Sequence, residues 1–142
     1  MNSRQITDSN SIKKFLMAGH AVFTIRSIKT QVRYTYRINW PEEGSNIRFI
    51  SVLSSGDLYQ YFGNLTTDGR YWHGKKSRIT PDAPSVKAFE WFLRHLLVGN
   101  TKVLNQMEFW HNGFCCRCGR PLTTPESIER GAGPHCAKMM EV

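Results

Sequence analysis

The first apolar residues of the chain follow the period of a helix. Three of them recur at helical spacing, at Ile12, Phe15 and Leu16. Asp8 or Ser9 can cap the first turn, because their side-chain oxygens accept hydrogen bonds from backbone amides that have no partner inside a helix. Gly19 is typical of the residue that follows a helix end. We therefore predict a helix over residues 10–18.

Between residues 20 and 79 the period changes to two, which is the period of a β-strand. The clearest alternation places one set of side chains on one face and a second set on the other: Val32, Tyr34, Tyr36 and Ile38 against Arg33, Thr35 and Arg37. The other extended runs are rich in β-branched and aromatic residues and cover residues 21–28, 47–53, 58–65 and 70–73. Gly56 and Gly69 lie in turns between these runs. This order predicts an antiparallel meander of four or five strands.

A broad apolar stripe after the strands predicts a second, longer helix. Its members are Val86, Phe89, Phe92, Leu93, Leu96 and Leu97. Pro84 suits the first turn of a helix, Asp82 or Ala83 precedes it, and Gly99 ends the pattern. Such a helix packs its apolar stripe on one face of a sheet. The fold class that we predict is α+β, an antiparallel meander packed by helices.

Four cysteines lie within 22 residues near the C-terminus, and none lies elsewhere. This clustering favours a metal site in a reducing compartment, because a disulfide framework spreads its cysteines along the chain. Cys115, Cys118 and Gly119 form a Cys-x-x-Cys-Gly knuckle, whose two thiolates converge on one cation. Cys136 follows after 17 further residues. We expect Cys115, Cys118 and Cys136 to be three ligands of a Zn²⁺ ion.

The sequence offers three candidates for the fourth ligand. We adopt His111, which three residues separate from the knuckle, so that the predicted site is His111, Cys115, Cys118 and Cys136. His135 is an alternative, although neighbouring residues rarely direct two ligand atoms at one tetrahedral centre. Cys116 is another. Four protein ligands leave no open position, so we expect the zinc to be structural.

The segment between the knuckle and Cys136 carries a recognisable pattern. Its residues are Gly119, Arg120, Leu122, Thr123, Pro125, Ser127, Gly131, Gly133 and Pro134. Thr123 or Thr124 before Pro125 predicts a short helix that closes at Gly131, and residues 137–140 predict another. The stretch from Cys115 to Cys136 resembles a zinc-finger-like domain family of unknown function in small phage, plasmid and bacterial proteins. The resemblance implies zinc binding and an origin on a mobile genetic element, and it implies no known activity.

We divide the chain at these motifs into an α+β domain, residues 1–105, and a zinc-binding module, residues 106–142. Residues 101–109 are expected to form a connector or a strand. The module is too short to contain a large core of its own. We therefore expect it to dock on the main domain or to depend on its metal for folding.

Nineteen Lys and Arg against eleven Asp and Glu give a net charge of +8, which favours polyanionic partners. Arg33 and Arg37 share one strand face. A second group lies in one segment: Arg70, Tyr71, Trp72, Lys75, Lys76 and Arg78. Aromatic rings stack bases while cations hold the backbone, so this segment fits a clamp for single-stranded nucleic acid. The alternative interpretation is an ordinary solvated sheet face and a basic loop whose aromatic rings fill the end of the core.

The function that we expect is a non-catalytic, zinc-containing protein that binds single- or double-stranded nucleic acid. No Gly-rich phosphate loop, Gly-x-Ser-x-Gly elbow or His-Glu-x-x-His motif occurs, so we expect no enzyme. The alternative is a phage- or plasmid-encoded anti-defence inhibitor that blocks a host nucleic-acid-handling complex by direct binding. A third hypothesis is a pocket between sheet and helix that holds a small nucleotide.

Neither membrane insertion nor secretion is indicated by the sequence. No run of about 18 apolar residues occurs. Residues 1–8 lack the apolar segment of a secretory signal. We expect a cytoplasmic protein without a membrane partner.

Overall fold

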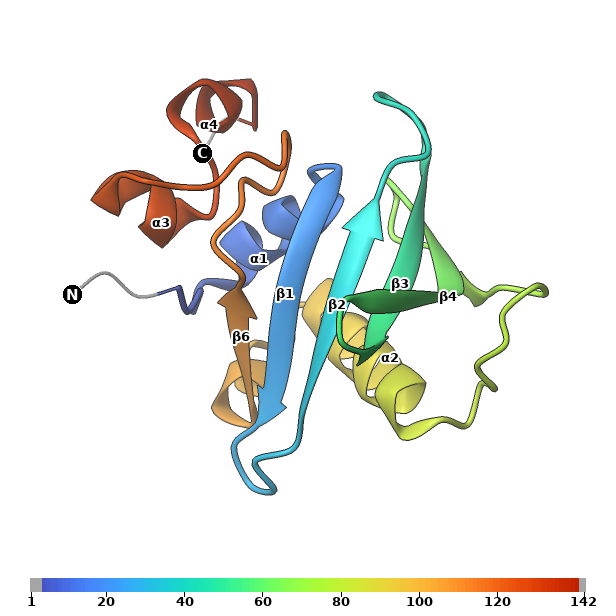
Figure 1. Cartoon of the computed structure of the whole chain (residues 1–142). Coiled ribbons are helices and arrows are strands. Elements are labelled where there is room, and N and C mark those ends of the chain that lie inside the picture. The colour runs from blue at the N-terminus through green and yellow to red at the C-terminus, as the bar shows by residue number, and fades with distance from the viewer. Residues whose placement is uncertain (1–3, 141–142) are drawn as a thin grey trace.

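The computed structural model describes residues 4–140, with Thr101 described by its backbone alone (Figure 1). In chain order the elements are α1 (Ser9–Met17), β1 (His20–Ser27), β2 (Arg33–Asn39), β3 (Ile47–Ser55), β4 (Leu58–Thr66), β5 (Tyr71–His73), α2 (Pro84–Leu97), the 3-10 helix η1 (Thr101–Asn105), β6 (Met107–His111), α3 (Pro125–Arg130) and α4 (Pro134–Met140). The predicted α+β class is confirmed. No helix within residues 4–140 has the length and apolar character needed to cross a membrane.

The strands form a single antiparallel sheet, which within the described residues has six strands in the order β5-β4-β3-β2-β1-β6. Strands β1 to β5 are the predicted meander, because each pairs with the next one along the chain. The sixth strand, β6, follows α2 and η1 in the chain and forms the edge of the sheet opposite to β5. It pairs with β1, with Ile25 opposite Phe109. The segment predicted to be a connector or a strand thus contains both, a turn of 3-10 helix followed by β6.

One face of the sheet forms the hydrophobic core with α1 and α2. The helical stripe is buried as predicted, and the largest enclosed side chains are aromatic: Phe15, Phe23, Tyr36, Phe62, Phe89, Phe92 and Phe109. The Phe89 ring of α2 packs 5.3 Å from the Tyr36 ring of β2, measured between centroids. The buried Tyr36 hydroxyl donates a hydrogen bond of 2.7 Å to the carbonyl of Ser85. Its polar atom is therefore satisfied at the junction of sheet and helix.

The opposite face of the sheet, which we call the outer face, is turned toward the viewer in Figure 1, with α1 and α2 behind it. Polar and charged side chains alternate here with the core residues along β1 and β2. Thr24 and Thr35 lie opposite each other and share a hydrogen bond of 2.7 Å. Arg26 donates to Glu108 of β6 at 2.6 Å. Cross-strand pairs of this kind support the sheet from the solvent side.

The C-terminal segment packs against α1 and the start of β1. The His20 amide donates to the Cys116 carbonyl at 2.6 Å, and the Cys116 amide donates to the Gly131 carbonyl at 3.0 Å. Gly131 lies against Phe15 so closely that a Cβ there would be 2.8 Å from the ring. The predicted division after residue 105 falls just before β6, so the first five-residue element of the proposed module is a strand of the main sheet.

Candidate metal centre and nucleic-acid interface

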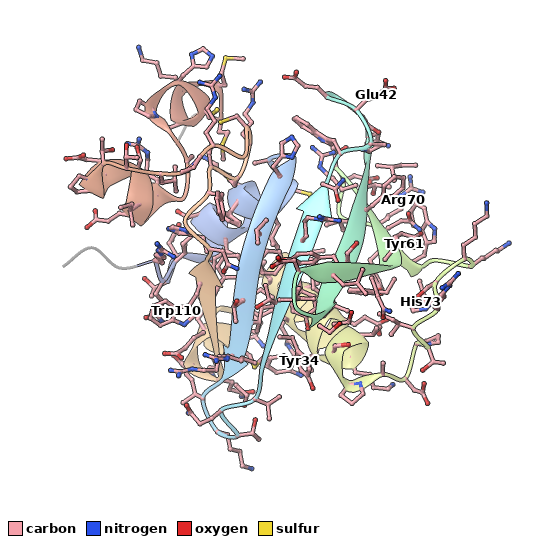
Figure 2. All side chains as sticks on the ribbon, viewed as in Figure 1. Tyr34, Glu42, Tyr61, Arg70, His73 and Trp110 are labelled. Carbon is pink, nitrogen blue, oxygen red and sulfur yellow. The ribbon has the colours of Figure 1, made fainter. Side chains whose placement is uncertain are left out.

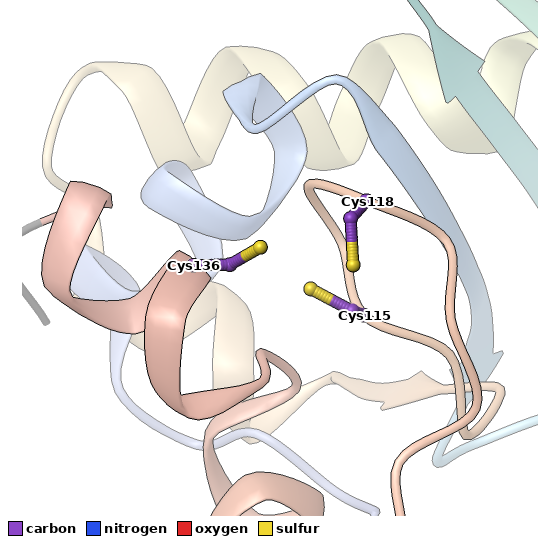
Figure 3. A group of neighbouring side chains, drawn as sticks. All are labelled: Cys115, Cys118 and Cys136. Carbon is purple, nitrogen blue, oxygen red and sulfur yellow. The ribbon is translucent and has the colours of Figure 1, made fainter.

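Three cysteine thiols meet at one point in the C-terminal segment. Cys115 and Cys118 lie in the turn after β6, and Cys136 lies in α4. All three Sγ atoms are within 4.8 Å of one another and point toward a common centre (Figure 3). Cys115 and Cys136 are buried, while Cys118 is exposed. The cluster therefore lies at the surface with one side open to solvent.

The knuckle that presents Cys115 and Cys118 is a tight backbone turn. The Gly119 amide donates to the Cys115 carbonyl at 2.9 Å, and Gly119 has a φ of 79°, which favours glycine. The Cys115 amide donates to the Arg120 carbonyl at 2.8 Å. The predicted Cys-x-x-Cys-Gly knuckle is thus formed by backbone hydrogen bonds in the structure.

Two short helices bring Cys136 back to the knuckle, as the spacing of the motif indicates. Thr124 caps α3 by accepting a hydrogen bond from the Ser127 amide, and Pro125 occupies its first turn. Gly131 ends α3 in the left-handed conformation, with a φ of 77°. The chain then enters α4, and the Gly133 amide donates to the Cys115 Sγ at 3.4 Å. The segment from Gly131 to Cys136 therefore closes directly over the knuckle.

The thiols of Cys115 and Cys136 differ in their pKa values. Burial disfavours the Cys115 thiolate, but donors from the backbone of Cys118, Gly133 and Arg117 outweigh it and lower the pKa to about 7. The pKa of Cys136 is raised to about 11, by burial first and then by the neighbouring thiols, although Arg117 opposes the shift. One thiolate is thus favoured and a second one beside it is disfavoured. A divalent cation bound between the sulfur atoms would favour the thiolate form of both cysteines, because its positive charge offsets their mutual repulsion.

The donor set fits a metal ion of the zinc type. Thiolates bound at about 2.3 Å around a tetrahedral centre are about 3.8 Å apart. The sulfur atoms, all within 4.8 Å of one another, need only a small contraction to reach that geometry. Cysteine thiolates are soft ligands and favour zinc among the divalent metals that cells commonly supply. The triad can therefore hold a metal ion.

His111 is not part of this cluster in the structure. It ends β6 in a buried position, stacked against Phe15 at 6.2 Å between ring centroids. Its Nδ1 accepts a hydrogen bond of 2.9 Å from the Gly113 amide, and its Nε2 is bonded to the Ile128 carbonyl of α3. Burial lowers its pKa most, while the bond to Ile128 acts in the opposite direction. Of the four predicted ligands, the structure brings together the three cysteines.

The other two candidates for the fourth position differ in access. Cys116 is fully buried, its Sγ contacts the Met140 Sδ at 3.8 Å, and burial raises its pKa. His135 is exposed and lines the same cleft of about 440 Å³ as the cysteine triad. Arg117 also lies in this cleft and connects it to the sheet domain through an ion pair with Glu43 at 3.1 Å. Of the two candidate imidazoles, His135 is thus the one that lines the same cleft as the cysteine triad.

Comparison with known proteins supports the C-terminal resemblance. Residues 107–140 match the model of a family described as a family of unknown function (DUF6011). The match begins at β6 and ends in α4, so it contains the whole cysteine triad. No curated protein and no solved structure matches the chain.

Part of the predicted basic set gathers on the outer face of the sheet. Arg33 and Arg37 are exposed on this face of β2, and Lys75 and Lys76 are exposed in the segment after β5. Arg37, Lys75 and Lys76 line one hollow of about 500 Å³, which we call the outer hollow. Its remaining lining residues are Asn39, Phe49, Ser51 and Tyr61. Two predicted groups, from residues nearly forty positions apart, therefore meet at one place.

The rest of the predicted basic and aromatic set does not line the outer hollow. Tyr71 lies on the core side, with its ring 6.0 Å from Phe89, whereas Trp72 of the same strand is 43% exposed. Successive residues of a strand point to opposite faces, so these two rings lie on opposite faces of β5. Arg70 pairs with Asp68 at 3.4 Å. Arg78 is exposed in the segment before α2.

Phe49, Tyr61 and Tyr59 are outer-face aromatic residues that the sequence analysis did not select. Phe49 lies opposite Asn39, and Tyr61 lies opposite Ser51. A register shift between Ile50 and Ser51 separates these two rows. The period of β3 alone could have placed Phe49 on the outer face, opposite to Ile50. The meeting of Phe49 with Tyr61 depends on the irregular register and is not visible in the sequence.

A separate hollow of about 580 Å³ lies between the β1–β2 turn and α2. It bears on the third hypothesis, a pocket between sheet and helix that holds a small nucleotide. Its lining includes Ile28, Val32, Tyr34, Trp91 and Met107 and is mainly apolar. Lys29 is the one charged residue among the described residues that line it. This hollow therefore offers little to the phosphates of a nucleotide.

Proposed function

We propose that the protein is a non-catalytic nucleic-acid-binding protein whose C-terminal segment is stabilised by a structural zinc ion. We further propose that it works in the cytoplasm and originates from a phage or another mobile element, as the resemblance of its cysteine segment implies. The observation that carries the binding proposal is the convergence of Arg37, Lys75 and Lys76 on the outer hollow, with Arg33 on the same face.

The charge of this face is uncompensated. None of Arg33, Arg37, Lys75 and Lys76 forms an ion pair with an acidic residue in the part of the chain that the structure describes. Glu108, an acidic residue on this face, is engaged by Arg26 at the β1–β6 edge. Cations without acidic partners attract phosphates, and each phosphate that they neutralise releases condensed counterions.

The metal has a structural role in this proposal. Cys115, Cys118 and Cys136 supply three thiolates, and the open side of the cleft leaves room for a fourth ligand such as His135. A zinc ion bound in this way would tie the turn after β6 to α4 and so fix the segment that packs on α1. Structural zinc contributes about 10 kcal/mol or more to the folding of small modules at neutral pH.

The test is fluorescence-anisotropy titration of labelled oligonucleotides with the zinc-loaded protein at about 50 and about 200 mM salt. We expect binding that weakens steeply with salt for unrelated sequences. A Lys75→Ala/Lys76→Ala variant should bind more weakly and with a shallower salt dependence. The matched control is Lys87→Ala/Lys102→Ala, which removes two exposed lysines outside the outer hollow and should bind like the wild type.

The opposite outcome favours the alternative function. A folded protein that binds no oligonucleotide at about 50 mM salt would contradict the proposal. Direct inhibition of a host nucleic-acid-handling complex would then be the function to test, by co-purification of the partner.

A further inference from the structure

The outer hollow combines its cations with two aromatic rings. Phe49 is 38% exposed, which is unusual for a phenylalanine in the middle of a sheet. The Phe49 and Tyr61 rings meet edge to face, with centroids 5.8 Å apart and an interplanar angle of 85°. No helix lies in front of β3 and β4 on the side shown in Figure 1. The hollow therefore presents aromatic surface to solvent where a core would normally hide it.

Tyr61 is held in place by the segment that carries the lysines. A Cβ on Gly74 would lie 2.3 Å from the Tyr61 Oη, so the ring rests directly on the glycine backbone. Lys75 and Lys76 follow this glycine at once. The position of the ring and the path of the two lysines are thus fixed by one contact. Figure 2 shows Tyr61 on the β4 side of the outer face, at the opposite end of the sheet from Trp110.

Arg37 is oriented on the other side of the hollow. Its guanidinium lies 4.6 Å from the centroid of the Tyr59 ring, a cation–π distance. This contact restricts the long side chain before any ligand arrives, so less conformational entropy is lost on binding. The cations thus flank the aromatic pair on two sides. Arg37 comes from β2, and the two lysines come from the segment after β5.

We propose that the outer hollow is a binding site for single-stranded nucleic acid, in which bases stack on Phe49 and Tyr61 while Arg37, Lys75 and Lys76 contact the phosphates. This inference rests on the proposed function and narrows it to one form of nucleic acid. Bases of a single strand can turn their faces to protein aromatic rings, whereas bases of a duplex are stacked on each other. A volume of about 500 Å³ is within the range of pockets that hold small organic groups such as a base with its sugar.

Two polar side chains of the outer hollow, Asn39 and Ser51, lie beside the aromatic rings. Asn39 is directly opposite Phe49, and Ser51 is directly opposite Tyr61, so each stands next to one ring. The Asn39 amide nitrogen donates to the Trp40 carbonyl at 3.3 Å, which directs its nitrogen toward the backbone. Its carbonyl oxygen is an acceptor for a base amino group. These contacts would add base preference to a site whose main interaction is stacking.

The experiment compares a labelled single strand of about 12 nucleotides with a hairpin duplex of the same sequence at about 50 mM salt. We expect the single strand to bind at least about 10-fold more tightly. Phe49→Leu and Tyr61→Leu should each weaken single-strand binding about 10-fold and leave duplex binding unchanged. Phe114→Leu is the matched control, because Phe114 is 44% exposed but does not line the outer hollow.

A second variant guards against effects on folding. Gly74→Ala changes no charge and no aromatic residue, but its Cβ must displace Tyr61. We expect it to weaken single-strand binding while the melting temperature stays within a few degrees of the wild type. Equal affinity for strand and duplex, unchanged in the Phe49 and Tyr61 variants, would overturn this inference and leave the proposed function standing. Absence of binding to either form would overturn both.

Discussion

The sheet domain and the cysteine segment hold their structures by different means. The sheet domain buries seven large aromatic side chains between the sheet and the helices α1 and α2, and burial of apolar surface favours folding. In the segment from residue 112 to 140 the buried residues are small: Cys115, Cys116, Ser127, Ala132, Cys136 and Ala137. Little apolar surface is removed from water there. The difference teaches that one chain can combine a domain that buries a large apolar core with a segment that buries little apolar surface and gathers three thiols instead.

Removal of the metal should have the largest effect, and this effect should be confined to the cysteine segment. We expect the Cys118→Ser variant, or the wild type after chelation, to lose order in residues 112–140, since structural zinc contributes about 10 kcal/mol. Metal content by mass spectrometry and limited proteolysis measure the effect. The sheet should remain resistant to the protease. Cys116→Ala is the control and should retain one metal per chain; full metal content in Cys118→Ser would refute the site.

A core substitution tests the other half of the comparison. Phe89→Ala should destabilise the sheet domain by about 3–5 kcal/mol, because it leaves a cavity among Tyr36, Phe62 and Tyr71. Denaturant unfolding measures this change. Leu58→Ala removes an apolar side chain that is 57% exposed and should change stability by less than about 0.5 kcal/mol. A similar effect of both substitutions would show that burial is not what stabilises the sheet.

His111 lies at the boundary of the two regions, and its substitution sharpens the comparison. His111→Gln should cost about 1–3 kcal/mol, because the buried partners at Gly113 and Ile128 lose well-placed hydrogen bonds. Metal content should stay at one per chain. His135→Gln, at an exposed position beside the triad, removes the proposed fourth ligand and should lower the metal content. A loss of metal in His111→Gln with little loss in His135→Gln would instead identify His111 as the fourth ligand.

The smallest expected effect is a pH dependence confined to α1. Hydrogen bonds from the Ser11 backbone and then its hydroxyl lower the pKa of Asp8 below its usual 3.8. A carboxylate with a lowered folded pKa contributes stability above the unfolded pKa, and this contribution is lost as the pH falls through the folded pKa. The wild type should thus lose slightly more stability below about pH 4 than Asp8→Asn. Parallel thermal melts of the two proteins across that range test the difference.

The sequence predicted those elements that are determined by residues close together in the chain. The caps Asp8 and Thr124, the alternation in β2 and the stripe of α2 all appear where the sequence placed them. The knuckle followed from Cys-x-x-Cys-Gly in the same way. Each of these features depends on residues within a few positions of one another, so their period and spacing are sufficient to predict them.

Features that depend on distant partners could not be predicted. Strand β6 has five residues, and its pairing with β1 joins positions that are 80 to 88 residues apart. The outer hollow exists because β2, β3, β4 and the segment after β5 meet across an irregular register. The partner of His111 is a carbonyl of α3, which the spacing of His111 from the knuckle does not reveal. Spacing shows which residues can reach a site, and tertiary packing decides which ones do.

The pairing of β6 with β1 also determines when the protein is complete during synthesis. The ribosome makes β1 early, but the strand that covers its edge contains residues 107–111. Until those residues leave the ribosome, β1 presents a free row of backbone donors and acceptors, and such edges template aggregation. The interval between the synthesis of β1 and that of β6 is thus the vulnerable period. Chains that end before residue 107 should accumulate as insoluble products.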